Sequence, residues 1–574
     1  MLTALKRSFP HVSWWIALVL WWASVHPTLM PRTSVTQGMI SAVAIGLGLM
    51  VGSLVHVVVA AIATRTSRSV PTPLGGRGGR VLTVAWAVVG VVGVVLWHGW
   101  QNDQRALVGL EPVGAARIVP MVVVTAVVTV LFVVIGRLVG MGVRRVHRGV
   151  TRVVPAWLAV ASTVVIVALV VWTLAVTVVG VRLLDAINTA YSTVDDGTEP
   201  GVEPTTSDLR SGGPGSLVTW ESLGEQGRTF VATGPTVAQL QDFADAGADA
   251  DAGTDPAVET GAGTTAIDPI RTYVGLQAAD TPEAQADLAV AELERTGAFG
   301  REVLVVVTVT GTGWVNPAAA AGLEYLFAGD TAMVATQYSY LPSWISFLVD
   351  LDKAAENSRT LLAAVRERWA AEPVETRPRL VVYGESLGSF GSESSFTPQG
   401  VRPTVDDVTS KVDGAMWVGP TFNNPLWNRM LDDRSSSNPA WYPGQDPPTP
   451  VRILGAPDED PPVPHTTDEG RIVYLTHPSD PVTWASISSL WWRPVWMHRP
   501  TGYDVPNTLR WMPGVTFVQN VVDLMAGFSA PPGHGHDYVP NIADGWVATV
   551  APDGWTGADT LRLRAVLDTF RTDA

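Results

Sequence analysis

Five long apolar runs near the start of the chain place the strongest constraint on its fold. Most of them approach or exceed the roughly 20 residues that an α-helix needs to cross the hydrocarbon layer of a membrane. The runs lie at residues 12–30, 36–63, 81–100, 118–140 and 155–183. We therefore predict an α-helical transmembrane domain of about five spans over residues 1–185, with the lipid bilayer as its partner.

The short segments that connect these runs indicate how the chain is oriented. Arg and Lys concentrate before the first run, between the second and third, and between the fourth and fifth. Such basic segments stay on the cytoplasmic side of a membrane. The other connections carry few or balanced charges, and the segment after the fifth run is acidic. This alternation predicts a multi-pass cell-membrane protein whose N-terminus is inside and whose later part is extracytoplasmic.

The two parts of the chain carry opposite net charge. Residues 1–185 contain 15 basic and three acidic residues, whereas the remainder contains 23 basic and 50 acidic residues. The acidic second part argues against nucleic-acid binding. No Asp, Glu or Lys lies well inside the apolar runs, and this favours an anchor over a transporter, because ion pathways use such groups. The absence of cysteine excludes a disulfide scaffold and a thiolate nucleophile.

Residues 186–268 have the composition of a linker with an acidic low-complexity region. Residues 186–215 are polar and rich in Gly, Pro, Ser and Thr, which is typical of an exposed connector. Residues 245–267 contain almost no large apolar side chain, and we predict a disordered surface loop there.

Residues 269–574 alternate short β-rich runs with amphipathic helices. Strands are predicted at residues 270–276, 302–310, 331–338, 379–383, 414–419, 471–476 and 516–522. Helices are predicted at residues 282–297, 317–328 and 351–371. Strands separated by helices of this length form a mostly parallel sheet with helices on both faces.

The stretch "VVYGESLGSF" contains the G-x-S-x-G pattern at Gly384, Ser386 and Gly388. It follows a continuously apolar strand and precedes a helix, which is the context of a nucleophile elbow. A serine hydroxyl becomes a good nucleophile when a base removes its proton and a third group orients that base. Ser386 is therefore the candidate nucleophile.

The partners of such a serine follow it in the order acid, then histidine. Asp480 comes directly after a late strand and is the candidate acid, with Asp523 as the alternative. The run "PPGHGHDY" supplies the base, for which we choose His536, with His534 as the alternative. Two histidines alone make an incomplete metal site, so we expect neither a catalytic metal nor a cofactor.

Backbone N–H groups are expected to form an oxyanion hole. One belongs to Leu387, the residue after the nucleophile, and another to the glycine-rich loop of Gly311, Thr312 and Gly313 after an earlier buried strand. Two Trp-rich insertions lie at residues 415–430 with 438–444 and at residues 484–500. We expect them to form an apolar ligand groove or a membrane contact, or else a satellite core under long loops.

Several longer motifs resemble a known family. The motifs are "TGTGWVNP", "QYSYLPSW", "GESLGSFGSE", "GPTFNNPLW" and "GHGHDY". They are similar to alpha/beta-hydrolase family 9, a bacterial and largely actinobacterial family that pairs an N-terminal multi-span membrane domain with a C-terminal hydrolase domain. The resemblance covers nearly the whole chain, and it implies an α/β-hydrolase fold with Ser386 as nucleophile.

These observations predict a membrane-anchored serine hydrolase that acts on an ester through an acyl-enzyme on Ser386. A lipid or an acylated component of the cell envelope would suit a site beside a membrane. Two alternatives are compatible with the same sequence: an acyltransferase that uses the same triad, and a non-catalytic membrane scaffold or lipid-binding protein with the same fold.

Overall fold

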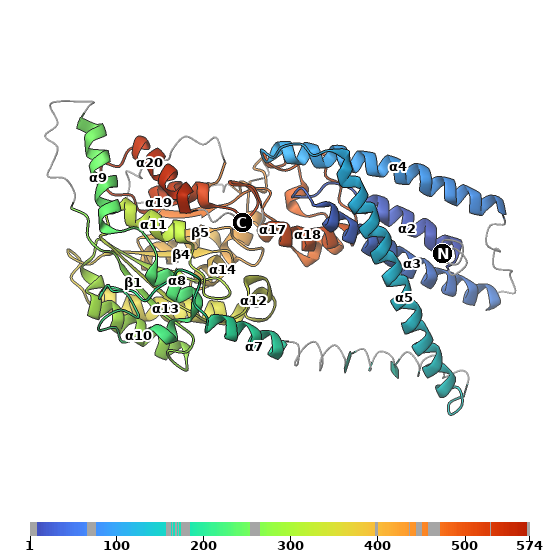
Figure 1. Cartoon of the computed structure of the whole chain (residues 1–574), viewed down its shortest axis with the longest axis horizontal. Helices are drawn as coiled ribbons and strands as arrows, with labels where there is room; N and C mark the ends of the chain where they lie inside the picture. Colours follow the sequence, from blue (N-terminus) through green and yellow to red (C-terminus); the bar gives the residue numbers. More distant parts are fainter. Residues whose placement is uncertain are drawn as a thin grey trace. The chain divides into compact units, whose positions relative to one another are not determined.

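The computed structural model describes most of the chain (Figure 1). The described residues are 9–65, 76–155, 184–252, 265–396, 400–435, 437–443, 450–456, 471–527 and 530–570, with a few single positions between 162 and 173.

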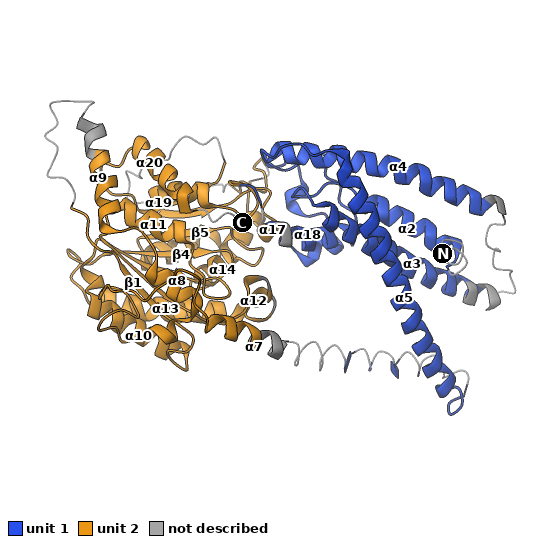
Figure 2. Ribbon diagram, in the orientation of Figure 1, with its two compact units in different colours: residues 1–184, 485–531 blue, residues 185–484, 532–574 orange. Residues whose placement is uncertain are grey.

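The chain divides into two compact units (Figure 2). Unit 1 contains Met1–Leu184 and Ala485–Pro531, and unit 2 contains Asp185–Trp484 and Pro532–Ala574. The sequence-based hydrolase domain of residues 269–574 includes the segment 485–531, whereas this segment groups with the N-terminal helices in the structure. Unit 2 is therefore built from two separate parts of the sequence.

Apolar helices make up most of unit 1. They are α2 (His11–Ser24), α3 (Ser34–Arg65), α4 (Gly76–Leu107) and α5 (Ile118–Val150). Among the described residues, three helices are long and apolar enough to cross a membrane: Ser34–Val59, Gly78–Leu107 and Ala115–Val150.

The two remaining runs do not add a described span. The first forms α2, which has 14 residues and is shorter than a membrane-crossing helix. Pro27 follows closely after its end at Ser24, and a proline cannot continue the hydrogen-bonding pattern of a helix. The fifth run, at residues 155–183, lies almost entirely outside the described residues.

Helix α18 (Val515–Gly527) joins unit 1 by packing against α2 and α3. Asp523 on α18 forms a buried ion pair with Arg32, with 3.0 Å between Arg32 Nε and Asp523 Oδ1. The Gln519 side-chain amide donates to the carbonyl oxygens of Ser24 and His26. The strand predicted at residues 516–522 is therefore wrong, because an apolar run this short has no period that distinguishes a strand from a helix.

Unit 2 is built on a seven-stranded parallel sheet with the strand order β1-β3-β2-β4-β5-β7-β6. The strands are β1 (Ile270–Val274), β2 (Val303–Thr308), β3 (Thr331–Thr336), β4 (Arg379–Glu385), β5 (Gly414–Val418), β6 (Val451–Leu454) and β7 (Arg471–Leu475). The central strands are buried along nearly their whole length, which explains why they are continuously apolar. The short edge strand β6 is half-buried and was not predicted.

Two groups of helices cover the sheet (Figure 1). One contains α10 (Pro282–Thr296), α13 (Leu351–Ala370) and α14 (Leu387–Glu393), in which α13 contacts both of the others. The other contains α11 (Pro317–Leu326), α19 (Ile542–Val550) and α20 (Gly557–Leu567), in which α19 contacts α11, α20, β5 and β7. The α/β-hydrolase architecture predicted from the sequence is confirmed.

The region before β1 is more ordered than its composition suggested. Arg210 forms an isolated parallel bridge with Arg271 on β1, and the backbone N–H of Tyr273 donates to Ser211 Oγ. These residues cover the edge of β1, so the predicted exposed connector does not extend to them. Helix α9 (Val237–Ala252) likewise occupies the start of the predicted disordered loop, whose residues 253–264 lie outside the described residues.

Candidate active site

The backbone at Ser386 adopts a strained conformation between β4 and α14. Its φ is 53° and its ψ is −122°. Ser386 and Ala328 are the two non-glycine residues with positive φ in the part of the chain that the structure describes. The Ser386 N–H donates to the Val418 carbonyl at the end of β5 (2.8 Å). A strained serine between a strand and a helix is the geometry of a nucleophile elbow.

The glycines of the G-x-S-x-G pattern are required by close backbone contacts. A Cβ atom at Gly384 would collide with the Gly388 carbonyl oxygen, and one at Gly388 would collide with the Thr308 carbonyl oxygen. Thr308 is the last residue of β2. The turn therefore packs against the neighbouring strand without space for side chains.

Asp480 and His536 are joined by a hydrogen bond of 2.7 Å between Asp480 Oδ2 and His536 Nδ1. Asp480 follows β7 and is fully buried, and it accepts two further hydrogen bonds. The Tyr538 hydroxyl donates to the same Oδ2 (2.7 Å), and the Val482 N–H donates to Oδ1 (2.8 Å). These donors compensate the burial of the carboxylate. Tyr538 was not singled out from the sequence, although it lies within the "GHGHDY" motif.

Ser386 and His536 lie at the same edge of the sheet. The His536 ring packs so closely on Gly419 that a Cβ atom there would collide with it. Gly419 directly follows Val418, whose carbonyl accepts the Ser386 N–H. The serine and the imidazole thus contact successive residues at the carboxyl end of β5, where catalytic groups of parallel α/β sheets gather.

The alternative acid and base have other surroundings. Asp523 belongs to α18 of unit 1, where it pairs with Arg32. The backbone carbonyl of His534 accepts the Asp537 N–H, in the turn that presents His536. Of the four candidates, the structure brings Asp480 and His536 together.

The surroundings of His536 favour its role as a base. Burial by itself lowers the pKa of the imidazole, but the charge and hydrogen bond of Asp480, with smaller contributions from Glu385 and Asp537, outweigh it and raise the net pKa above the ordinary value of 6.5. Because Nδ1 donates to Asp480, the neutral ring can take up a proton at Nε2.

The glycine-rich loop after β2 forms a turn that other elements hold in place. The Gly313 N–H donates to the Thr310 carbonyl (2.6 Å), which commits this amide to the turn. The Gly313 carbonyl accepts from the Tyr273 hydroxyl (2.8 Å), and the Thr312 carbonyl accepts from the Gln337 amide (3.0 Å). As the first residue of α14, Leu387 has no acceptor for its N–H within the helix.

A buried carboxyl next to the candidate nucleophile Ser386 connects the turn at Ser386 to this loop. Glu385 Oε2 accepts hydrogen bonds from Asn316 Nδ2 and from the Tyr383 hydroxyl, both at 2.8 Å. Asn316 also caps α11, where its Oδ1 accepts from the Ala318 N–H. Burial raises the pKa of Glu385 above its ordinary value, against the opposing effect of these hydrogen bonds. Glu385 was not singled out from the sequence, although a charged residue at the end of a buried strand is a signal that could have found it.

Within the described residues, no three His, Asp or Glu side chains come together in a way that could hold a metal ion.

Comparison with known protein families identifies the chain. Residues 270–563 match the model of an alpha/beta-hydrolase family, and residues 25–235 match the model of the N-terminal region of that family. The chain belongs to this alpha/beta-hydrolase family. The resemblance to alpha/beta-hydrolase family 9 and its N-terminal domain is therefore confirmed. No match was found among curated proteins or among solved structures.

The close packing around Gly388 should make the stability of this alpha/beta-hydrolase sensitive to a side chain at that position. We expect Gly388→Ala to lower the melting temperature of the purified protein by several degrees, because the added methyl group forces β2 and α14 apart. Gly300→Ala is the matched control, since no atom lies within 4 Å of a Cβ atom at that position. Equal melting temperatures for the two variants in thermal unfolding would contradict the close contact.

Proposed function

We propose that unit 2 is a serine hydrolase that cleaves an ester through an acyl-enzyme on Ser386. The observation that carries the proposal is the 2.7 Å hydrogen bond between the buried Asp480 and His536, at the same sheet edge as the strained Ser386. This arrangement supplies a nucleophile, a base and a group that orients the base.

The proposed reaction has two steps. The Ser386 Oγ attacks the ester carbonyl carbon while its proton passes to His536 Nε2, and Asp480 stabilises the resulting imidazolium. Backbone N–H groups of Leu387 and of the loop at Gly311 and Thr312 stabilise the oxyanion. The alcohol leaves with the proton from His536, and water activated by the same histidine then hydrolyses the acyl ester on Ser386.

A lipid or an acylated component of the cell envelope is the substrate class that fits this proposal best. The hydrolase unit is covalently linked to a unit whose described residues include three helices that could cross a membrane. An enzyme held in this way meets esters at the bilayer at a high effective concentration. The proposal therefore describes a membrane-anchored, multi-pass hydrolase.

We expect fluorophosphonate probes to label the full-length protein at Ser386. Ser386→Ala abolishes labelling because the attacking oxygen is absent, and His536→Ala slows it by at least about 100-fold, which is the lower range for loss of a general base. Ser394→Ala and His534→Ala are the matched controls and retain labelling.

Labelling is measured on membranes by gel fluorescence. A wild-type protein that stays unlabelled while a known serine hydrolase reacts would contradict the enzyme proposal and favour a non-catalytic scaffold. Undiminished labelling of Ser386→Ala would exclude Ser386 as the nucleophile.

The rate of labelling should depend on pH through His536. The raised pKa means that the imidazole is protonated, and unable to act as a base, over a wider acidic range than an ordinary histidine. The rate therefore falls as the pH drops, with a midpoint above 6.5. Asp480→Asn removes the carboxylate that raises this pKa, so we expect a slower reaction whose midpoint lies at lower pH. Asp553→Asn, which changes an exposed residue, should leave the pH midpoint of labelling unchanged.

We also propose that the hydrolase unit is extracytoplasmic, as the alternation of basic segments predicts. The natural absence of cysteine permits a direct test with single cysteines. In intact spheroplasts, a membrane-impermeant maleimide should label Val374→Cys, whose native side chain is 70% exposed. Arg148→Cys, in a segment assigned to the cytoplasm, should react only after permeabilisation. The reverse pattern would overturn the orientation.

A further inference from the structure

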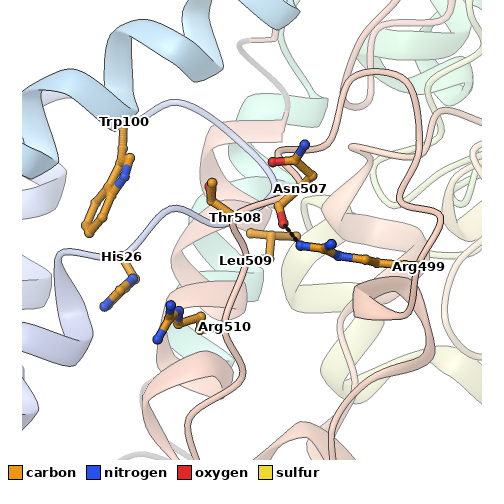
Figure 3. A pocket seen from close by; sticks show the side chains of 7 residues that line it. All are labelled: His26, Trp100, Arg499, Asn507, Thr508, Leu509 and Arg510. Carbon is orange, nitrogen blue, oxygen red and sulfur yellow. Dashed lines mark hydrogen bonds between the residues drawn. The ribbon is translucent and has the colours of Figure 1, made fainter.

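A pocket of about 290 Å³ lies within unit 1 (Figure 3). His26, just after α2, and Trp100, on α4, contribute to one part of its lining. The loop before α18 contributes Arg499, Asn507 and Arg510. The Trp100 and His26 rings are stacked with 4.8 Å between their centroids. The pocket thus combines an aromatic pair with two guanidinium groups.

The pocket lies at one end of the apolar helices. The Arg32 N–H, before α3, donates to Gln101 Oε1 near the end of α4 (2.5 Å), and the Arg32 carbonyl accepts from Arg117 at the start of α5 (2.7 Å). His26 and Trp100 are near neighbours in sequence of Arg32 and Gln101. In a helix that crosses a membrane, such an end lies at the level of the lipid head groups.

The pocket is suited to an anion. No Asp or Glu is among its lining residues. Arg499 uses Nη2 to donate to the Asn507 backbone carbonyl (3.0 Å), which orients its planar guanidinium (Figure 3). A guanidinium offers five N–H donors and pairs well with the oxygens of a phosphate group. Both arginine side chains are exposed, so they are accessible to a ligand.

Large apolar side chains on the same chain segment favour a lipid as the source of that phosphate. Trp491 and Trp492 are 66% and 73% exposed, and Ile487 is 70% exposed. Tryptophan beside arginine is typical of protein surfaces at the membrane interface. Trp496, in the same Trp-rich insertion, is 5% exposed, so the exposed large apolar side chains of this insertion are confined to the part around Trp491 and Trp492.

We propose that the pocket formed by His26, Trp100, Arg499 and Arg510 binds the phosphate group of an anionic membrane phospholipid. The site belongs to unit 1 and is independent of the hydrolase chemistry. Its occupant would hold the segment 485–531, which connects Asp480 to His536 along the chain, against the membrane surface.

The test uses full-length protein in non-ionic detergent, titrated with dioleoyl phosphatidylglycerol and observed by native mass spectrometry. We expect one lipid to bind in preference to dioleoylglycerol, which has the same acyl chains and no phosphate. Arg499→Gln and Arg510→Gln should each weaken binding by about tenfold, the effect of losing a charge-assisted hydrogen bond. Arg493→Gln changes an exposed arginine of the same segment outside the pocket and should weaken binding less than twofold.

Four outcomes would overturn the proposal. Equal weakening by Arg493→Gln would indicate general charge attraction, and equal binding of dioleoylglycerol would indicate apolar contact alone. Displacement of the lipid by an equal concentration of inorganic phosphate would make free phosphate the ligand. Unchanged lipid affinity in both the Arg499→Gln and the Arg510→Gln variants would show that the lipid does not bind in this pocket. Melting temperatures and fluorophosphonate labelling are measured on every variant, so a folding defect or a failed hydrolase proposal is recognised separately.

Discussion

The hydrogen bond between Asp480 and His536 is the contact on which the candidate active site depends. The two residues are 56 positions apart, and most of the chain between them belongs to unit 1. A buried carboxylate is costly unless donors surround it, and here the imidazole, the Tyr538 hydroxyl and a backbone N–H fulfil that need. The polar contacts of Asp480 thus hold His536, after the chain returns from unit 1, at the same edge of the sheet as Ser386.

The parts of the fold that could be predicted from the sequence are those with strong local signals. The central strands are continuously apolar because both faces are covered, and the elbow needs glycines because three backbone segments converge there. Strand β6 and helix α18 carry weaker signals. β6 is short and half-buried, and residues 516–522 are apolar in a pattern compatible with either a strand or a helix until α2 and α3 are in place.

The residues of the candidate site likewise include some that the sequence predicts and some that it does not. Chain order and strand position led to Asp480, but the choice between His534 and His536 depends on a turn that composition does not encode. Tyr538 and Asn316 act through contacts with residues distant in sequence, so no local pattern revealed them. The Trp-rich insertions contain both buried and exposed side chains, because burial depends on the presence of a partner. Trp427 packs on Tyr474 and Trp484, whereas Trp492 is largely exposed.

The division of unit 2 into two parts of the sequence affects how it can be isolated. The chain passes between the units after Leu184, after Trp484 and after Pro531. A soluble fragment that begins at residue 185 would retain α18, with Asp523 deprived of Arg32 and Gln519 deprived of its acceptors at Ser24 and His26. Such a fragment would expose a helix evolved for burial and would tend to aggregate. A short loop that replaces residues 485–531 is the rational route to a water-soluble form of unit 2.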